Sequence, residues 1–310
     1  MSSTRPRFVQ LPHPGREIAP RQDAVPWNTG SHGRKFLRGN GEYLAEGAET
    51  LPRSGELVFW GEWESPSRIV ERWPRARQLP RALHEPCWTR PIEPYPRQNT
   101  DPWVFGDRMI YSNCKQNTRK GPTALRGLER GSVIVFGSVL GGEFCVDTVF
   151  VVASAEPWTP LAVAEHGLDD AFLAATAEPL GAPAGDGCSV PDGKGNCAPA
   201  PKAVLTLYRA ATFDDPVDGM YSFVPALPAA ADGPRFARPS VRIPGAINSA
   251  STQSHRSAPG VDSPAAVAAL WRETRRQIVD QDLVLATRLD IPAECAGPAA
   301  VIPPRAGTVC

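Results

Sequence analysis

The sequence contains no long apolar run, no CxxC pair and no excess of either charge. Its apolar runs fall well short of the roughly 18 residues that a membrane helix needs, so we expect no membrane partner. The N-terminus also lacks the apolar segment of a secretory signal, which predicts a cytoplasmic protein. Lys and Arg number 33, as do Asp and Glu. A net charge of zero therefore gives no overall sign of a polyanionic partner.

The charges are nevertheless unevenly distributed. Residues 1–130 hold 21 Lys and Arg against 14 Asp and Glu, and the remainder of the chain is correspondingly acidic. A basic half favours a phosphate-bearing or nucleic-acid partner, and mutual attraction between the two halves explains it equally well. The arginines of the stretch 68–81 support the first interpretation as contacts to a nucleic-acid backbone, and a solvated face is the alternative.

Seven cysteines are scattered along the chain in no ligand pattern. Because no Cys/His quartet with zinc spacing occurs, we expect no metal site, and no motif indicates a cofactor. An odd count without a secretory signal predicts reduced thiols. Cys188 and Cys197 flank a glycine-rich loop, and whether they pair is left open.

Proline and glycine, at 34 and 27 residues, limit helix content and favour short strands. The apolar runs 133–136 and 149–152 predict two strands that are buried on both faces. Ser263 and Pro264 predict the start of a helix, because a hydroxyl N-cap followed by proline is a typical first turn. We therefore predict an α+β protein, built on a β-rich curved sheet or small open barrel with peripheral helices and a long C-terminal helix.

The domain organisation follows from composition. Residues 1–177 are predicted to form the main β-rich domain. Residues 178–203 are rich in glycine and proline and are typical of a linker or long loop. Residues 204–310 then form a smaller α+β portion docked on the first. Within it, the acids Asp214, Asp215 and Asp218 surround a turn and are interpreted as turn and capping residues.

The central segment 98–116 is the candidate site, because amides, carboxylates and aromatic rings are concentrated there. Side chains of these kinds recognise the edge and the face of a heterocycle such as a nucleobase. The alternative for each polar residue is a local bond to the backbone of a turn. The segment contributes Asn99, Asp101, Trp103, Tyr111, Asn113, Lys115 and Gln116 as ligand-binding candidates.

Three further groups complete the hypothesis. Trp60 and Trp63 alternate with acids near the end of a predicted strand and are candidates for an aromatic wall. Arg34 and Lys35 follow a cluster of turn residues and are candidates for phosphate binding. Asp147 lies inside a predicted strand, where it must be paired or protonated. Together with Asp101 and Asp107 it is a candidate acid or base, and pairing with an arginine is the structural alternative.

The order of elements over about residues 55–155 resembles PUA-like domains of the EVE, ASCH and YTH kind. The resemblance rests on a strand with tryptophans, a short "LxxLxxG" helix, and the strands "GSVIVFGS" and "DTVFVV". It implies a small open barrel and a nucleic-acid or modified-base ligand, with Trp60, Trp63 or Trp103 lining the pocket.

These observations lead to two functional hypotheses and a third alternative without a ligand site. The first is a nucleotide or nucleic-acid binding protein with an aromatic and amide-lined pocket. The second is an enzyme that acts on a nucleotide-like molecule through the aspartates. The third is a structural or interaction protein without a small-molecule site. Convergence of the titratable groups in one closed pocket favours the enzyme, and an open polar groove favours the binder.

Overall fold

The computed structural model describes most of the chain. The described residues are 5–16, 34–45, 51–65, 67–74, 76, 78–90, 100–118, 121–160, 166–178, 190–191, 197–198, 204–229, 235–251 and 255–296. Asn99, Cys188 and most of the predicted linker 178–203 lie outside these ranges.

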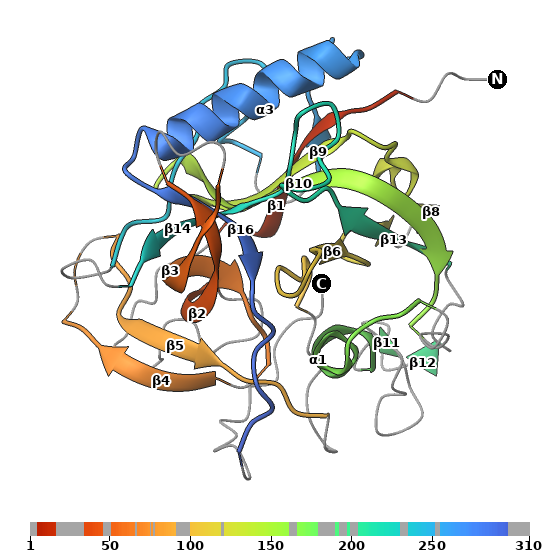
Figure 1. Cartoon of the computed structure of the whole chain (residues 1–310). Coiled ribbons are helices and arrows are strands. Elements are labelled where there is room, and N and C mark those ends of the chain that lie inside the picture. The colour runs from red at the N-terminus through yellow and green to blue at the C-terminus, as the bar shows by residue number, and fades with distance from the viewer. Residues whose placement is uncertain are drawn as a thin grey trace.

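The first large sheet has six strands, arranged around the two apolar strands that the sequence predicts (Figure 1). Because β9 (Val133–Leu140) and β10 (Glu143–Trp158) pair antiparallel, with Ile134 opposite Phe150, the two runs are direct neighbours. β1 lies parallel to β9 on the other side. In spatial order the strands are β15 (Arg256–Ser257), β1 (Phe8–Arg16), β9 (Val133–Leu140), β10 (Glu143–Trp158), β13 (Leu205–Ala210) and β6 (Ile110–Tyr111).

Both faces of this sheet are covered, which explains the uninterrupted apolar runs. Successive side chains of a strand point to opposite faces. Accordingly, Val133 and Val135 pack into one hydrophobic cluster, whereas Ile134 and Phe136 pack into another. The first cluster also includes Trp271 of the helix α3.

The second large sheet closes partly on itself. β2 pairs with both β3 and β16, and β14 joins β3 to β16, so that these four strands form a closed barrel. β5 and β4 extend the sheet from β2. The strands are β16 (Val284–Leu289), β14 (Val224–Pro228), β3 (Arg53–Glu62), β2 (Arg34–Leu44), β5 (Ala82–Pro86) and β4 (Ser67–Arg72). The structure is therefore mostly β and contains a barrel, as predicted.

Helices are few among the described residues. The predicted helix begins with Ser263 as its N-cap and is α3 (Pro264–Val279), which lies across one face of the first sheet (Figure 1). It has 16 residues and the strand β16 follows it, so it is not a long C-terminal helix. The remaining elements are short: η1 (Ala124–Gly127), α1 (Asp170–Phe172), the π-helical turn η3 (Leu173–Ala177), and the hairpins β7 (Asn117–Thr118) with β8 (Gly121–Pro122) and β11 (Val190–Pro191) with β12 (Cys197–Ala198).

The portion after residue 204 contributes strands to both large sheets. β13 pairs with β10 in the first sheet, while β14 and β16 complete the barrel. Contact between the two predicted portions therefore runs through backbone ladders as well as through the helix.

The prediction of reduced thiols is wrong for one pair. Cys87 and Cys295 form a disulfide across a sequence separation of 208 residues. Sequence spacing carries no signal for a pair so distant, because only the fold brings the two residues together. Cys114 and Cys145 are buried and keep their thiols outside any disulfide. Within the described part of the chain, no helix has both the length and the apolar character to span a membrane.

Candidate functional site

Asp101 organises the central segment as a structural anchor. Its carboxylate is fully buried and accepts backbone N–H bonds from Ser112, Asn113 and Cys114 at 2.8, 3.0 and 2.6 Å. Burial raises the pKa of Asp101, and the three backbone donors oppose that shift. A carboxylate that is enclosed and saturated in this way holds a loop and does not face a ligand.

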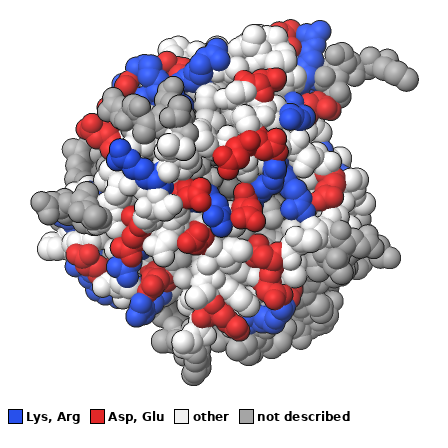
Figure 2. Space-filling model, in the orientation of Figure 1, with Lys and Arg blue, Asp and Glu red and all other residues white. Residues whose placement is uncertain are grey.

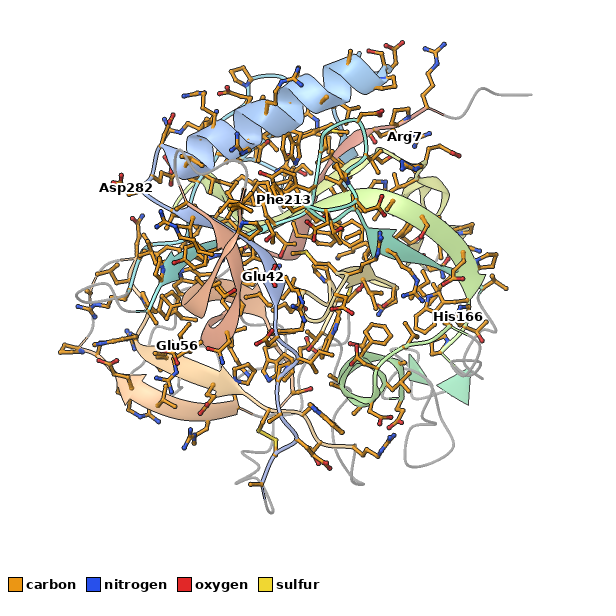
Figure 3. The ribbon with its side chains drawn as sticks, viewed as in Figure 1. Arg7, Glu42, Glu56, His166, Phe213 and Asp282 are labelled. Carbon is orange, nitrogen blue, oxygen red and sulfur yellow. A yellow bond between two sulfur atoms is a disulfide. The ribbon has the colours of Figure 1, made fainter. Side chains whose placement is uncertain are left out.

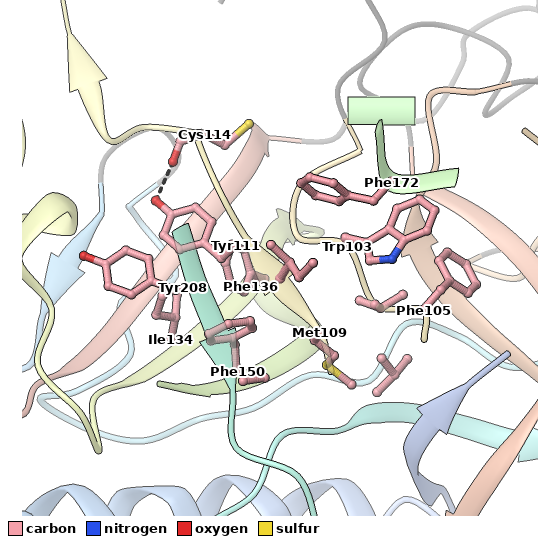
Figure 4. Close-up of a cluster of buried hydrophobic side chains, with 14 of the residues drawn as sticks. Trp103, Phe105, Met109, Tyr111, Cys114, Ile134, Phe136, Phe150, Phe172 and Tyr208 are labelled. Atoms are coloured by element: carbon pink, nitrogen blue, oxygen red, sulfur yellow. Dashed lines mark hydrogen bonds between the residues drawn. The ribbon is translucent and has the colours of Figure 1, made fainter. Parts of the chain in front are cut away.

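The other polar residues of the segment are mostly bound in the same way. Gln116 is buried, and its amide both donates to Thr206 O at 2.7 Å and accepts from Thr206 N at 2.8 Å. Tyr111 is buried, donates to Cys114 O at 2.6 Å and stacks on Tyr208 (Figure 4). Asn113 donates from Nδ2 to Ser112 Oγ at 3.3 Å. Lys115 is half-buried with a positive φ of 63°.

The three tryptophans do not meet around one hollow. Trp63 and Trp103 pack together with ring centroids 5.8 Å apart, inside the largest hydrophobic cluster. Trp103 also contacts Phe105 and Phe172 edge-on (Figure 4). Trp60 belongs to a separate cluster and is therefore apart from the other two. All three side chains are at most 1% exposed, so their surface stabilises the interior.

Arg34 and Asp147 belong to a buried ionic network, which corrects the phosphate-binding hypothesis for Arg34. Arg34 donates to Asp147 at 2.5 Å and to Glu62 at 2.6 Å. Arg238 donates to the same Asp147 carboxylate and to Ser138. Burial lowers the pKa of Arg34, but the carboxylates of Asp147 and Glu62 together raise it by more. The net pKa is therefore raised, and the guanidinium stays charged. The expected pairing of Asp147 with an arginine is confirmed.

Lys35 is also enclosed. Its ammonium donates to Ser65 O at 3.1 Å, and burial lowers its pKa to about 8 although Glu64 opposes the shift. His84 lies nearby, where burial, Lys35 and Arg72 lower its pKa to about 3. Neither side chain offers an exposed cation to a phosphate.

The described surface contains a charged cleft of about 370 Å³ between the barrel and the loops of the first sheet. β2 contributes Glu42 and β16 contributes Thr287 and Arg288. The turn before β6 contributes Asp107 and Arg108, and the loop after β13 contributes Thr212, Phe213 and Asp214. Pro52 completes the lining. Figure 3 labels Glu42 and Phe213, and Figure 2 shows acidic and basic side chains interspersed across this face.

The arginines of the cleft are already paired with carboxylates. Arg288 lies 3.1 Å from Glu42 and 3.3 Å from Asp107. Arg108 lies 2.5 Å from Asp215, and this hydrogen bond lowers the pKa of the Asp215 carboxyl. The Asp107 side chain is 91% exposed, so it keeps most of its acceptor capacity for another partner.

Of the predicted site residues that the structure describes, only Asp107 lines this cleft. The sequence predicts turn and capping roles for Asp214 and its neighbouring acids. Their proximity to Phe213 in the sequence is the signal that could have indicated a binding site. Glu42, Thr287 and Arg288 carry no such signal, because they lie on β2 and β16, which are distant in the sequence and meet only in the fold.

No known protein family, curated protein or solved structure matches this chain. Among the described residues, no group of three or more His, Cys, Asp or Glu is placed to hold a metal ion.

Proposed function

We propose that the protein binds a small molecule that carries a nucleobase, and that the cleft between β2, β16 and the loop after β13 is its site. The observation that supports this proposal is the combination of Asp107, Asp214 and the half-buried ring of Phe213 in one cleft. Carboxylates accept hydrogen bonds from the N–H groups of a base, and an aromatic ring offers a face for stacking. The volume of about 370 Å³ falls within the usual range of small-molecule sites.

The charges of the cleft favour a nucleoside over a polyphosphate. Three carboxylates line it against two arginines, and both arginines have acidic partners. A phosphate would have to compete with these partners for the guanidinium groups and would meet repulsion from the remaining carboxylates. We therefore propose a ligand that the cleft recognises through its base and not through its phosphates.

The resemblance to PUA-like domains supports the same class of ligand. Of the four barrel strands, β3 alone lies in the stretch 55–155 that carries the resemblance, and β9 and β10 belong to the other sheet. The pocket implied by the resemblance would lie at the tryptophans, whereas the cleft proposed here uses different residues. Membership of that family stays a proposal that rests on the order of elements alone.

Calorimetric titration of the full chain with the common nucleosides, their monophosphates and their triphosphates tests the proposal. We expect at least one nucleoside to bind, and each added phosphate to weaken binding more at low salt than at high salt, because salt screens the repulsion. Single-stranded and double-stranded oligonucleotides extend the panel to the nucleic-acid partner. Absence of binding across the whole panel at low salt contradicts the proposal.

A second candidate is an interaction protein without a small-molecule site. The observation that favours it is that Asp101, Gln116 and Tyr111 are hydrogen-bonded to backbone groups of the protein itself. The enzyme alternative has less support, since Asp101 and Asp147 are enclosed and bonded and only Asp107 reaches solvent. If the titrations show no ligand, the second candidate is the one to pursue.

A further inference from the structure

The segment that leaves the cleft ends at the disulfide. Arg288 lines the cleft, and the chain then continues through 290–296 to Cys295, which is bonded to Cys87 beyond the end of β5. The disulfide therefore ties the segment after β16, which closes the barrel, to the residue that follows β5, and both strands pair with β2.

Apart from the disulfide, this segment is held mainly by a few backbone hydrogen bonds. Trp88 N donates to Ala293 O at 3.1 Å, and Cys295 N donates to Trp88 O at 2.8 Å. Its side chains are exposed or half-buried, and Ile291 is 43% exposed. Segments with little buried apolar surface open at low free energy, so the covalent bond contributes much of the local order.

The same segment fixes the wall of the cleft. Asp290 N donates to Asn40 O at 2.8 Å, and Gly106 N donates to Leu289 O at 2.8 Å. Gly106 immediately precedes Asp107, and Leu289 immediately follows Arg288. The bond between Gly106 and Leu289 thus sets the register in which Asp107 and Arg288 face each other at 3.3 Å.

We infer that the Cys87–Cys295 disulfide is a redox latch that sets the shape of the cleft. With the disulfide formed, residues 290–296 are anchored at both ends and the cleft wall is ordered. With the disulfide reduced, the segment opens and the contact between Leu289 and Gly106 loosens. The control of ligand binding by this latch rests on the proposed function, whereas the opening of the segment does not.

The chemistry is thiol–disulfide exchange with a dithiol reductant. One thiolate of the reductant attacks a sulfur of the disulfide, forms a mixed disulfide and releases one cysteine thiolate. The second thiol of the reductant then displaces the other cysteine and closes its own disulfide. Two electrons and two protons pass to the protein, which ends with two thiols. Both cysteines are half-buried, so a small dithiol can reach the bond.

Hydrogen exchange measured by mass spectrometry tests the latch without any ligand. The full chain is compared before and after treatment with dithiothreitol, and the Cys87→Ser/Cys295→Ser variant serves as the second form. We expect amide exchange in 289–296 and at Gly106 to rise by about tenfold or more on reduction, and exchange in α3 to stay unchanged. The variant should show the faster exchange with and without dithiothreitol.

Unchanged exchange in 289–296 after complete reduction overturns the latch, and so does a variant that still responds to dithiothreitol in this segment. Titration of the same two redox forms with the nucleoside panel separates the latch from the proposed function. Weaker binding by the reduced form supports control of the site, and equal binding overturns that control. A panel that binds neither form removes the proposed function, while the exchange data still decide the latch.

Discussion

Arg34 joins the two large sheets through Asp147. Arg34 is the first residue of β2 in the barrel and donates from Nε at 2.5 Å to Asp147, which lies on β10 of the other sheet. Both side chains are at most 2% exposed. Because Glu62 and Arg238 complete the network, each charge in it has an opposite partner. Such a network is balanced as a whole, and loss of one member leaves its partner charge buried without compensation.

The first prediction concerns this network. Asp147→Asn should lower the free energy of unfolding by about 3–5 kcal/mol, because Arg34 and Arg238 both lose the negative charge of the Asp147 carboxylate. Urea unfolding followed by circular dichroism measures the change. Asp107→Asn is the matched control, since this carboxylate is 91% exposed, and it should shift the value by no more than about 0.5 kcal/mol. Equal effects of the two substitutions would contradict the structural role of Asp147.

The second prediction concerns Asp101. Asp101→Asn replaces one acceptor oxygen with a donor that faces backbone N–H groups. We expect a loss of about 2–4 kcal/mol in the free energy of unfolding, because hydrogen bonds to charged groups are strong and an N–H is left unsatisfied. Thermal unfolding measures it, with exposed Asp290→Asn as the control. If Asp101 acted only in ligand binding, Asp101→Asn would be as stable as the control.

The third prediction is a pH dependence caused by His84. Its pKa in the folded protein is about 3, against 6.5 for an unperturbed histidine. Between these values the unfolded state binds more protons, so stability is full above pH about 6.5 and falls as the pH decreases toward about 3. The loss contributed by His84 is on the order of 4 kcal/mol over this window.

His84→Gln isolates this contribution from that of the acidic residues. The amide can replace the contact of the ring with Ser67 Oγ, which is 2.9 Å long in the protein. Urea unfolding at several pH values should give a shallower acid slope for the variant than for the wild type. Parallel slopes would show that His84 titrates normally in the folded state.

The fourth prediction concerns the cleft. Asp107→Asn removes one charged acceptor that faces solvent, and we expect it to weaken binding of the nucleoside identified in the panel by about tenfold. Titration calorimetry measures the affinity. Glu56→Gln removes an exposed carboxylate that does not line the cleft and should leave the affinity unchanged. A loss of affinity in both variants would indicate a general effect of charge and not a site at Asp107.

Local patterns predicted local structure well. The runs 133–136 and 149–152 became β9 and β10 because their side chains are apolar on both faces and both faces are covered. Ser263 caps α3 through a hydrogen bond to Ala266 N. In each case a pattern within a few residues of the chain was enough to predict the secondary structure at that position.

The sequence was a poorer guide to the candidate site, because residues that are distant in the sequence determine the surroundings of each side chain. A turn rich in amides and carboxylates is compatible with ligand binding and with hydrogen bonds to backbone. Asp101 bonds to the backbone of its own segment, and Gln116 bonds to that of Thr206 in β13. Trp60 and Trp63 are near in sequence yet pack into different clusters. Successive side chains of β3 point to opposite faces, so Phe59 joins the cluster of Trp63 while Trp60 joins the other. The cleft itself is formed by strands that meet only after the barrel closes.

That closure has a consequence for synthesis. The barrel closes only when β2, which begins at residue 34, pairs with β16, which ends at residue 289. During translation, the edge of β2 that pairs with β16 therefore stays without this partner until residue 289 has left the ribosome. Folding that depends on so remote a partner is slow, and the nascent chain is exposed to aggregation during that time. Shielding by a ribosome-associated chaperone should accordingly raise the yield of this protein more than it does for one whose neighbouring strands pair as they emerge.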